Sequence, residues 1–255
     1  MLWYKSWLET RWRFLIGFAV LICSACSIVF VYPQVAKLVP LASAIDAGSE
    51  LGREIREGAA QASDYRSYIW SQWFGQGLPQ LWLLFATLLG TGCLLSKSSG
   101  RAALFTLSLP VSRNRLAAVR AAAGLAEVLV LAFIPSLAIP LFSQAVGQSY
   151  GAGSALIYSV CLFVTGSIFF SLAFLFSTLF DDVWRPWLLS LAAAGSLRLL
   201  ELAFHARAPY SIFGVMHGED YFRSGELPWL GLFTGALISA AILYGAARSL
   251  ARADF

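Results

Sequence analysis

Three ionisable side chains stand inside otherwise apolar stretches of this sequence, where a charge is costly and therefore informative. Glu127 follows Arg120 by seven positions, and Arg198 and Glu201 share a later apolar run. A charged group in hydrocarbon costs on the order of 3 kcal/mol on insertion scales, so it normally faces a bundle interior, a water-filled cavity or an opposite charge. Such a group can serve a proton, cation or cargo path. It can equally be a hydrogen-bonded structural residue, and the i, i+3 spacing of Arg198 and Glu201 also suits a local ion pair.

No catalytic or metal-ligating set accompanies these three residues. The only histidines, His205 and His217, are twelve positions apart, which is not the spacing of paired metal ligands on a helix. The lysines are Lys5, Lys37 and Lys97, and none of them ends the glycine-rich motif that cradles nucleotide phosphates. The sequence therefore predicts no catalytic residue, no metal site and no cofactor site in this chain. If ATP drives the protein, another chain must bind it.

The composition shows what kind of element must hold these charges. Of 255 residues, 58% are hydrophobic, 15% aromatic and only 13% charged. These fractions exclude a soluble domain, a disordered chain and a disulfide scaffold, and they indicate a protein embedded in lipid. The net charge of +4 then reflects orientation in the membrane rather than binding of nucleic acid.

Runs without charges predict six membrane-spanning helices. A span needs about 20 apolar residues, and continuous apolar runs without alternation favour helices over a barrel. We expect an all-α integral membrane protein in which residues 1–255 form a single transmembrane domain. The predicted spans cover residues 14–32, 74–96, 116–144, 155–180, 187–204 and 229–247.

The segments between the spans predict the orientation. With both termini in the cytoplasm, the inner side carries eleven Lys and Arg residues and the outer side six. Residues 1–13 repeat aromatic and apolar positions at i, i+4 beside charges, which is typical of an amphipathic interfacial helix. The extracytoplasmic loop 33–68 should contain one helix near 48–62. The second outer loop, 205–228, is either irregular or built of short helices that dip into the bilayer.

The cytoplasmic segment 97–120 carries five basic residues and no acid. Pro110 marks a turn or a helix start within it, and apolar residues flank that turn. Such a loop suits docking of a soluble partner, although a positive loop that grips lipid headgroups has the same composition.

This segment also resembles a known family. Leu109 to Arg120 reads Leu-Pro-Val-Ser-Arg-x-x-Leu-x-x-x-Arg, which is similar to the loop between the second and third helices of type-2 ATP-binding-cassette (ABC) exporter permeases. The charged segment before the first span and the six-helix topology resemble the same family. The resemblance implies an exporter permease subunit of a bacterial inner membrane that pairs with a second permease subunit, as a homo- or heterodimer.

It also implies a separate nucleotide-binding ATPase that holds ATP and magnesium. The residues that would form the coupling loop to this ATPase are Leu109, Pro110, Val111, Ser112, Arg113 and Arg115. The alternative is an ion-coupled secondary transporter that uses Glu127 and the Arg198/Glu201 pair. Small residues that share helix faces, among them Gly90, Gly235 and Gly245, predict close packing, either within one chain or between two copies.

Overall fold

The computed structural model describes residues 2–43, 58–91, 113–180, 182–204 and 211–252. All regular elements of these residues are helices, which confirms the all-α prediction. Besides a helical stretch at 58–63, they are α1 (Leu2–Ser43), α3 (Tyr65–Ile69), the π-helix η1 (Trp70–Gly77), α4 (Leu78–Gly90), α6 (Arg113–Ala145), α7 (Ala152–Ser177), α8 (Trp184–Phe204), α9 (Ile212–His217), α10 (Glu219–Ser224) and α11 (Trp229–Arg252).

Four of these helices are long and apolar enough to cross a membrane. The qualifying segments are Ser6–Pro40, Arg115–Ala145, Ala152–Ser177 and Trp229–Leu250. Large apolar side chains such as Leu141 and Phe233 are exposed on the bundle surface, where lipid rather than water suits them. The helix lengths and this apolar exterior are those of a membrane protein.

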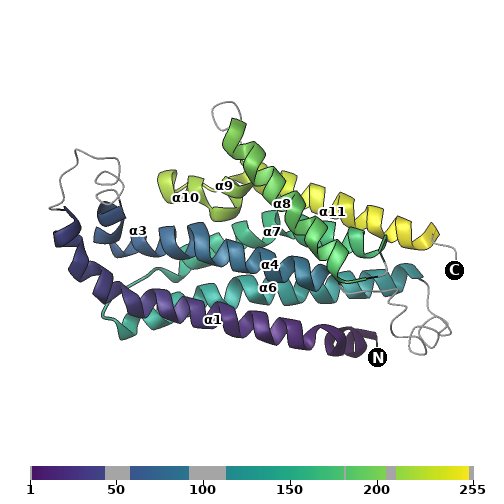
Figure 1. Cartoon of the computed structure of the whole chain (residues 1–255), viewed down its shortest axis with the longest axis horizontal. Helices are drawn as coiled ribbons and strands as arrows, with labels where there is room; N and C mark the ends of the chain where they lie inside the picture. The colour runs from purple at the N-terminus through teal and green to yellow at the C-terminus, as the bar shows by residue number, and fades with distance from the viewer. Residues whose placement is uncertain (1, 44–57, 92–112, 181, 205–210, 253–255) are drawn as a thin grey trace.

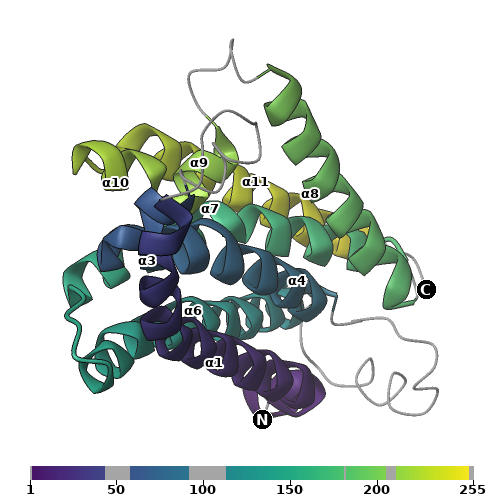
Figure 2. The ribbon, with the colours of Figure 1, turned by 60° about the vertical axis from the view of Figure 1, so that its left-hand side comes forward.

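Helix α7 is the centre of the bundle. It contacts α4, α6, α8, α9 and α11. In its most apolar stretch 67% of the residues are buried, compared with 22% in that of α1. Figure 1 shows that α1 begins, α4 ends, α6 begins and α11 ends at one end of the bundle, called here the N-terminal end. The short helices α3, α9 and α10 lie at the opposite end. In Figure 2 α8 leans away from the other long helices.

Helix α1 is longer than the sequence indicates. It runs without interruption from Leu2 to Ser43, so the predicted interfacial segment 1–13 and first span are one helix, and segment 33–68 begins as helix rather than loop. Pro33 and Pro40 lie inside it. A proline removes one helical hydrogen bond, and apolar membrane helices tolerate this loss when neighbouring groups compensate. The residues around 48–57, where a further helix was predicted, lie outside the described ranges, and residues 58–63 are helical.

The second long helix contains a π-helical segment. Residues 65–90 are helical throughout, and the amide of Leu78 donates to the carbonyl of Trp73, five residues earlier, as a π-helix requires. This helix therefore begins nine residues before the predicted span 74–96, whose bounds in the membrane stay a prediction. The last residues of that span lie outside the described ranges. Trp82 of α4 is fully buried and donates from Nε1 to the carbonyl of Val128 at 3.0 Å, which joins α4 to α6.

Aromatic pairs assemble the end opposite the N-terminal end. Trp70 of η1 stacks on Phe222 of α10 with ring centroids 4.1 Å apart. Tyr158 of α7 lies 4.6 Å from Phe74 and 5.5 Å from Tyr221. Edge-to-face and offset pairs each add about 0.5–1.5 kcal/mol beyond burial, so this cluster holds α10 against η1 and α7.

Two of the small residues, Gly90 and Gly235, pack closely against other helices of this chain. A Cβ added at Gly90 of α4 would lie 2.7 Å from the carbonyl oxygen of Phe170 in α7, and one at Gly235 of α11 would lie 3.3 Å from Cα of Thr165. These distances show close backbone approach between helices of one chain. A Cβ at Gly245 meets no atom within 4 Å.

The described part of segment 205–228 contains two short helices, α9 and α10, so it is not wholly irregular, and whether these helices enter the bilayer stays a prediction. Ser211 caps α9 by accepting from the amide of Gly214 at 2.9 Å. Gly218, with φ of 65°, then adopts the left-handed conformation that ends α9 and turns the chain into α10.

Candidate functional site

The predicted coupling loop is seen only where α6 begins. Leu109, Pro110, Val111 and Ser112 lie outside the described residues. Arg113 is the first residue of α6, and the side chain of Arg115, in the first turn, is exposed. The structure therefore shows the helix that the loop enters, and the groups that this helix touches.

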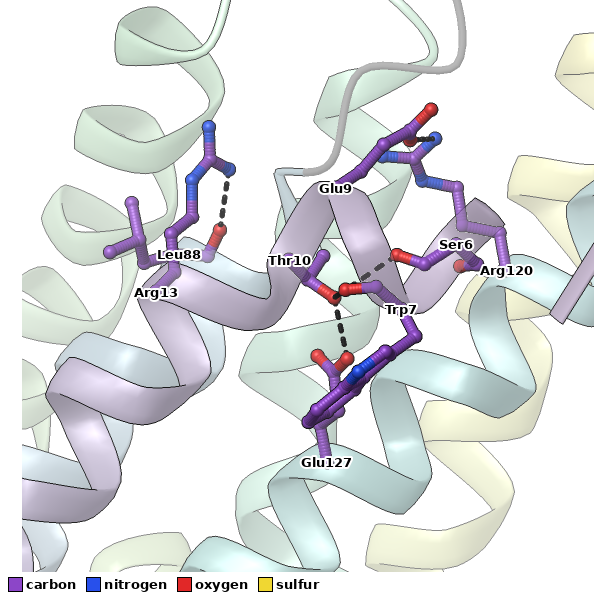
Figure 3. A network of polar contacts seen from close by, with 8 residues as sticks. All are labelled: Ser6, Trp7, Glu9, Thr10, Arg13, Leu88, Arg120 and Glu127. Atoms are coloured by element: carbon purple, nitrogen blue, oxygen red, sulfur yellow. Dashed lines mark hydrogen bonds and ion pairs between the residues drawn. The ribbon is translucent and has the colours of Figure 1, made fainter. Parts of the chain in front are cut away.

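A buried hydrogen bond joins the first turns of α1 to α6 (Figure 3). The Thr10 hydroxyl donates to Glu127 Oε1 at 2.5 Å, and both side chains are buried. Thr10 also lies 3.2 Å from the carbonyl of Ser6 in its own helix. Because a hydroxyl has one proton, donation to Glu127 and donation to the helix compete. Glu127, predicted as an intramembrane polar residue, is thus a contact between two helices.

The second carboxyl oxygen of Glu127 differs from the first. Oε2 is buried and has no hydrogen-bond partner among the described residues. A buried polar atom without a partner costs about 1–3 kcal/mol, so it normally binds water, an ion or a proton. The geometry leaves this oxygen available for such a ligand.

Two further contacts extend the network at the N-terminal end. Glu9 Oε2 lies 2.8 Å from Nη1 of Arg120 on α6, whose side chain is only 14% exposed. Arg13 donates from Nη1 to the carbonyl of Leu88 in the last turn of α4, at 3.4 Å. The first turns of α1 therefore hold both α4, which ends at Gly90, and α6, which begins at Arg113 (Figure 3).

Arg198 and Glu201 form a second polar site, separate from Glu127. Arg198 Nη1 lies 3.7 Å from Glu201 Oε2, a long ion pair, and its guanidinium is 5.3 Å from the ring centre of Phe213. Glu201 has closer partners on α9. It accepts from the Ser211 hydroxyl and from the amide of Ile212, both at 2.6 Å. The principal role of Glu201 is thus to anchor the start of α9 to α8.

Arg198 borders a cavity of about 550 Å³ between the η1–α4 helix, α8 and α9. Its lining is polar at the α9 side and apolar farther along α4 and α8. The lining residues are Gly75, Gln76, Pro79, Gln80, Leu83, Leu191, Ala194, Gly195, Arg198, Phe213, Met216 and His217. Burial, and secondarily the positive charge of Arg198, lowers the pKa of His217 to about 4, so this imidazole is neutral at physiological pH.

Sequence reasoning found part of each site. It singled out Glu127, Arg198 and Glu201 because charges in apolar runs are rare. It missed Thr10, because a threonine among the charges of an amphipathic segment carries no such signal. It also missed Gln76 and Gln80, whose i, i+4 spacing on one helix face could have indicated a polar stripe.

The remaining chemistry is sparse. No group of three His, Cys, Asp or Glu side chains comes together among the residues that the structure describes. Comparisons with family models, with curated proteins and with solved structures find no match to this chain.

Proposed function

We propose that this chain is the membrane-spanning subunit of a transporter, driven by a separate ATPase that docks on segment 97–120. Six helices would cross the membrane, with both termini in the cytoplasm. Two helices join the four apolar ones in this proposal: the continuous helix 65–90 and the 21-residue α8. At 1.5 Å per residue each is about 30 Å or longer, the thickness of the hydrocarbon core.

The observation that carries the proposal is that α1 bonds to both α4 and α6, the helices that precede and follow the basic loop. Arg13 bonds to the end of α4, and Glu9 and Thr10 bond to side chains of α6. A push on the loop between these helices therefore displaces α1 as well. This is the connection that a transport subunit needs if force applied at its surface is to open a path through its helices.

The mechanism follows from that connection. ATP binding by the partner would press on the loop, and the α6 start would move with it. The Glu9–Arg120 pair and the buried Thr10–Glu127 bond would carry the movement into α1. A second permease subunit, identical or different, would supply the other wall of the path, and lipid would surround both.

Direction and location come from the likeness of Leu109 to Arg120 to exporter permeases, which supports export across a bacterial inner membrane. On this proposal the chain is not an enzyme. It holds no cofactor, since ATP and magnesium belong to the partner.

Purification of the chain from its native membrane in mild detergent, followed by quantitative mass spectrometry, tests the proposal. We expect a nucleotide-binding ATPase in about equal amount, and its loss on Arg115→Glu. Arg185→Glu is the matched control, because Arg185 is 72% exposed at the start of α8 and the charge change is the same. Recovery of the chain without an ATPase, or equal loss in both variants, would contradict the proposal.

A second candidate is an ion-coupled carrier, and the unpartnered Oε2 of Glu127 favours it. A proton or cation at this oxygen would couple to α1 through Thr10. Transport would then stop on addition of a protonophore and in Glu127→Gln, with no ATPase present. The ATPase-driven mechanism instead predicts transport that continues with a protonophore and stops when ATP is removed.

A further inference from the structure

The cavity between the η1–α4 helix, α8 and α9 changes character along its length. On α8, Leu191, Ala194 and Arg198 recur at helical spacing and share one face. The facing helix presents Gln76 and Gln80 near the level of α9, and then Leu83. One end of the cavity therefore offers a cation and two amides, and the other end offers aliphatic side chains.

The positive charge at the polar end is poorly neutralised. Glu201 is the one acid paired with Arg198 among the described residues, and it lies 3.7 Å away, while its oxygens accept from Ser211 and Ile212 at 2.6 Å. The Arg198 side chain remains 44% exposed. A guanidinium keeps several donors in a planar fork that fits phosphate or carboxylate.

The amides are equally available. Gln76 and Gln80 are exposed and make no side-chain hydrogen bond within the part of the chain that the structure describes. The wider turn of η1 sets Gly75 and Gln76 at the cavity, which is the kind of local departure that π-helical segments often bring to functional sites. Amide N–H groups would complete the coordination of an anion held by Arg198.

We propose that this cavity binds an anionic amphiphile, with its phosphate or carboxylate headgroup at Arg198 and its chain along Leu83 and Leu191. The volume of about 550 Å³ lies within the range of small-molecule sites. Among the described lining residues, Arg198 carries the one formal charge, and its positive sign favours an anion. The apolar end favours a ligand with an alkyl chain over a free ion. That this amphiphile is the cargo rests on the transport function proposed above, whereas the binding does not.

Gly195 offers a way to fill the cavity without disturbing its walls. It lies on the same face of α8, and a Cβ added there meets no atom within 4 Å. Gly195→Leu therefore places its side chain in the open space, and leucine favours the helix over glycine. Gly245→Leu is the matched control, because its Cβ also meets nothing and it does not line the cavity.

The test is calorimetric titration of dodecyl phosphate into the full chain in phosphatidylcholine nanodiscs, with empty discs subtracted. We expect saturable binding, weakened about tenfold or more by Arg198→Gln and by Gly195→Leu. Arg198→Lys, which keeps the charge and loses the planar fork, should bind more weakly than the parent chain and more tightly than Arg198→Gln. Gly245→Leu should bind within a few-fold of the parent chain. Thermal unfolding of each variant in the same discs verifies its fold, and Gly195→Leu decides the matter if Arg198→Gln does not fold.

Two other ligands test whether the site requires both the anionic headgroup and the alkyl chain. Inorganic phosphate should not saturate the site at concentrations at which the binding of dodecyl phosphate is complete. Dodecyl maltoside, which has the same chain and no charge, should not bind saturably. Equal binding of inorganic phosphate, equal binding of the maltoside, or unchanged binding of dodecyl phosphate in both test variants would overturn the proposal. No ATPase takes part in the titration, so its outcome is independent of the proposed drive.

Discussion

Thr10 and Glu127 are 117 positions apart in the chain and are joined by a hydrogen bond of 2.5 Å inside the bundle. The bond connects the helix that begins the chain to the helix that follows the basic loop. Since the other oxygen of Glu127 has no partner among the described residues, Thr10 supplies the hydrogen bond on which this buried carboxyl depends.

Thr10→Val should therefore destabilise the protein. Valine keeps the shape of threonine but leaves Glu127 without its donor, a loss of about 1–3 kcal/mol for a buried group. Thermal unfolding in detergent micelles measures the change. Thr234→Val is the control, because the bonds of the exposed Thr234 hydroxyl to described residues lie within its own helix, at the carbonyls of Leu230 and Gly231. Equal losses of stability in the two variants would contradict the predicted contribution of the Thr10–Glu127 bond.

The ion pair of Glu9 and Arg120 should couple measurably. Its partners are 40% and 14% exposed, so solvent screens one of them, and a coupling energy of up to about 1 kcal/mol is expected. A double-mutant cycle with Glu9→Gln and Arg120→Gln gives this value. The same cycle on Glu219 and Arg223, whose side chains are 36% and 74% exposed, should give a smaller coupling energy than the Glu9–Arg120 pair. A larger coupling in the second pair would refute the ranking.

Gly90 should tolerate no side chain. Alanine there would place Cβ 2.7 Å from the Phe170 carbonyl oxygen, and a backbone atom cannot move aside as a side chain can. We expect Gly90→Ala to cost about 1–3 kcal/mol, through separation of α4 from α7. Gly245→Ala, which meets nothing, should be neutral or slightly stabilising. Unfolding midpoints that are the same for the two alanine variants would contradict the close approach of these helices.

His217 should remain neutral well below the ordinary titration range of an imidazole. Its pKa of about 4, against 6.5 for the free side chain, means that the folded chain disfavours the proton. The associated stability is complete above about pH 6.5 and is lost as the pH falls toward 4. NMR of labelled histidine in His205→Gln, which leaves one imidazole, follows the titration. A midpoint near 6.5 would show that His217, the last residue of α9, is not buried beside Arg198 as described.

The sequence could predict the long helices because hydrocarbon tolerates few alternatives. Charge-free runs locate α6, α7, α8 and α11 to within about five residues at each end. Six crossings and the sidedness of the termini remain predictions. The length of α1 was not predictable from composition, because Pro33 reads as a helix end unless the surrounding packing is known.

The sites were less accessible from the sequence. Glu127 stands out as a charge in an apolar run, but its partner Thr10 could be found only from the packing of α1 on α6. The i, i+3 spacing correctly placed Arg198 beside Glu201. It could not reveal that Glu201 anchors α9, since that bond depends on how the chain returns after α8.

The central claim is that a separate ATPase acts on the loop before α6, and photo-crosslinking in the native membrane tests it most directly. A benzophenone amino acid replaces Val111 in one variant and Trp229 in the other. Trp229 is 71% exposed and is the first residue of α11, so the length of this helix separates it from the N-terminal end of the bundle. After irradiation, the account predicts an adduct with a nucleotide-binding ATPase at position 111 and none at 229. An ATPase adduct at both positions, or none at position 111, would contradict it.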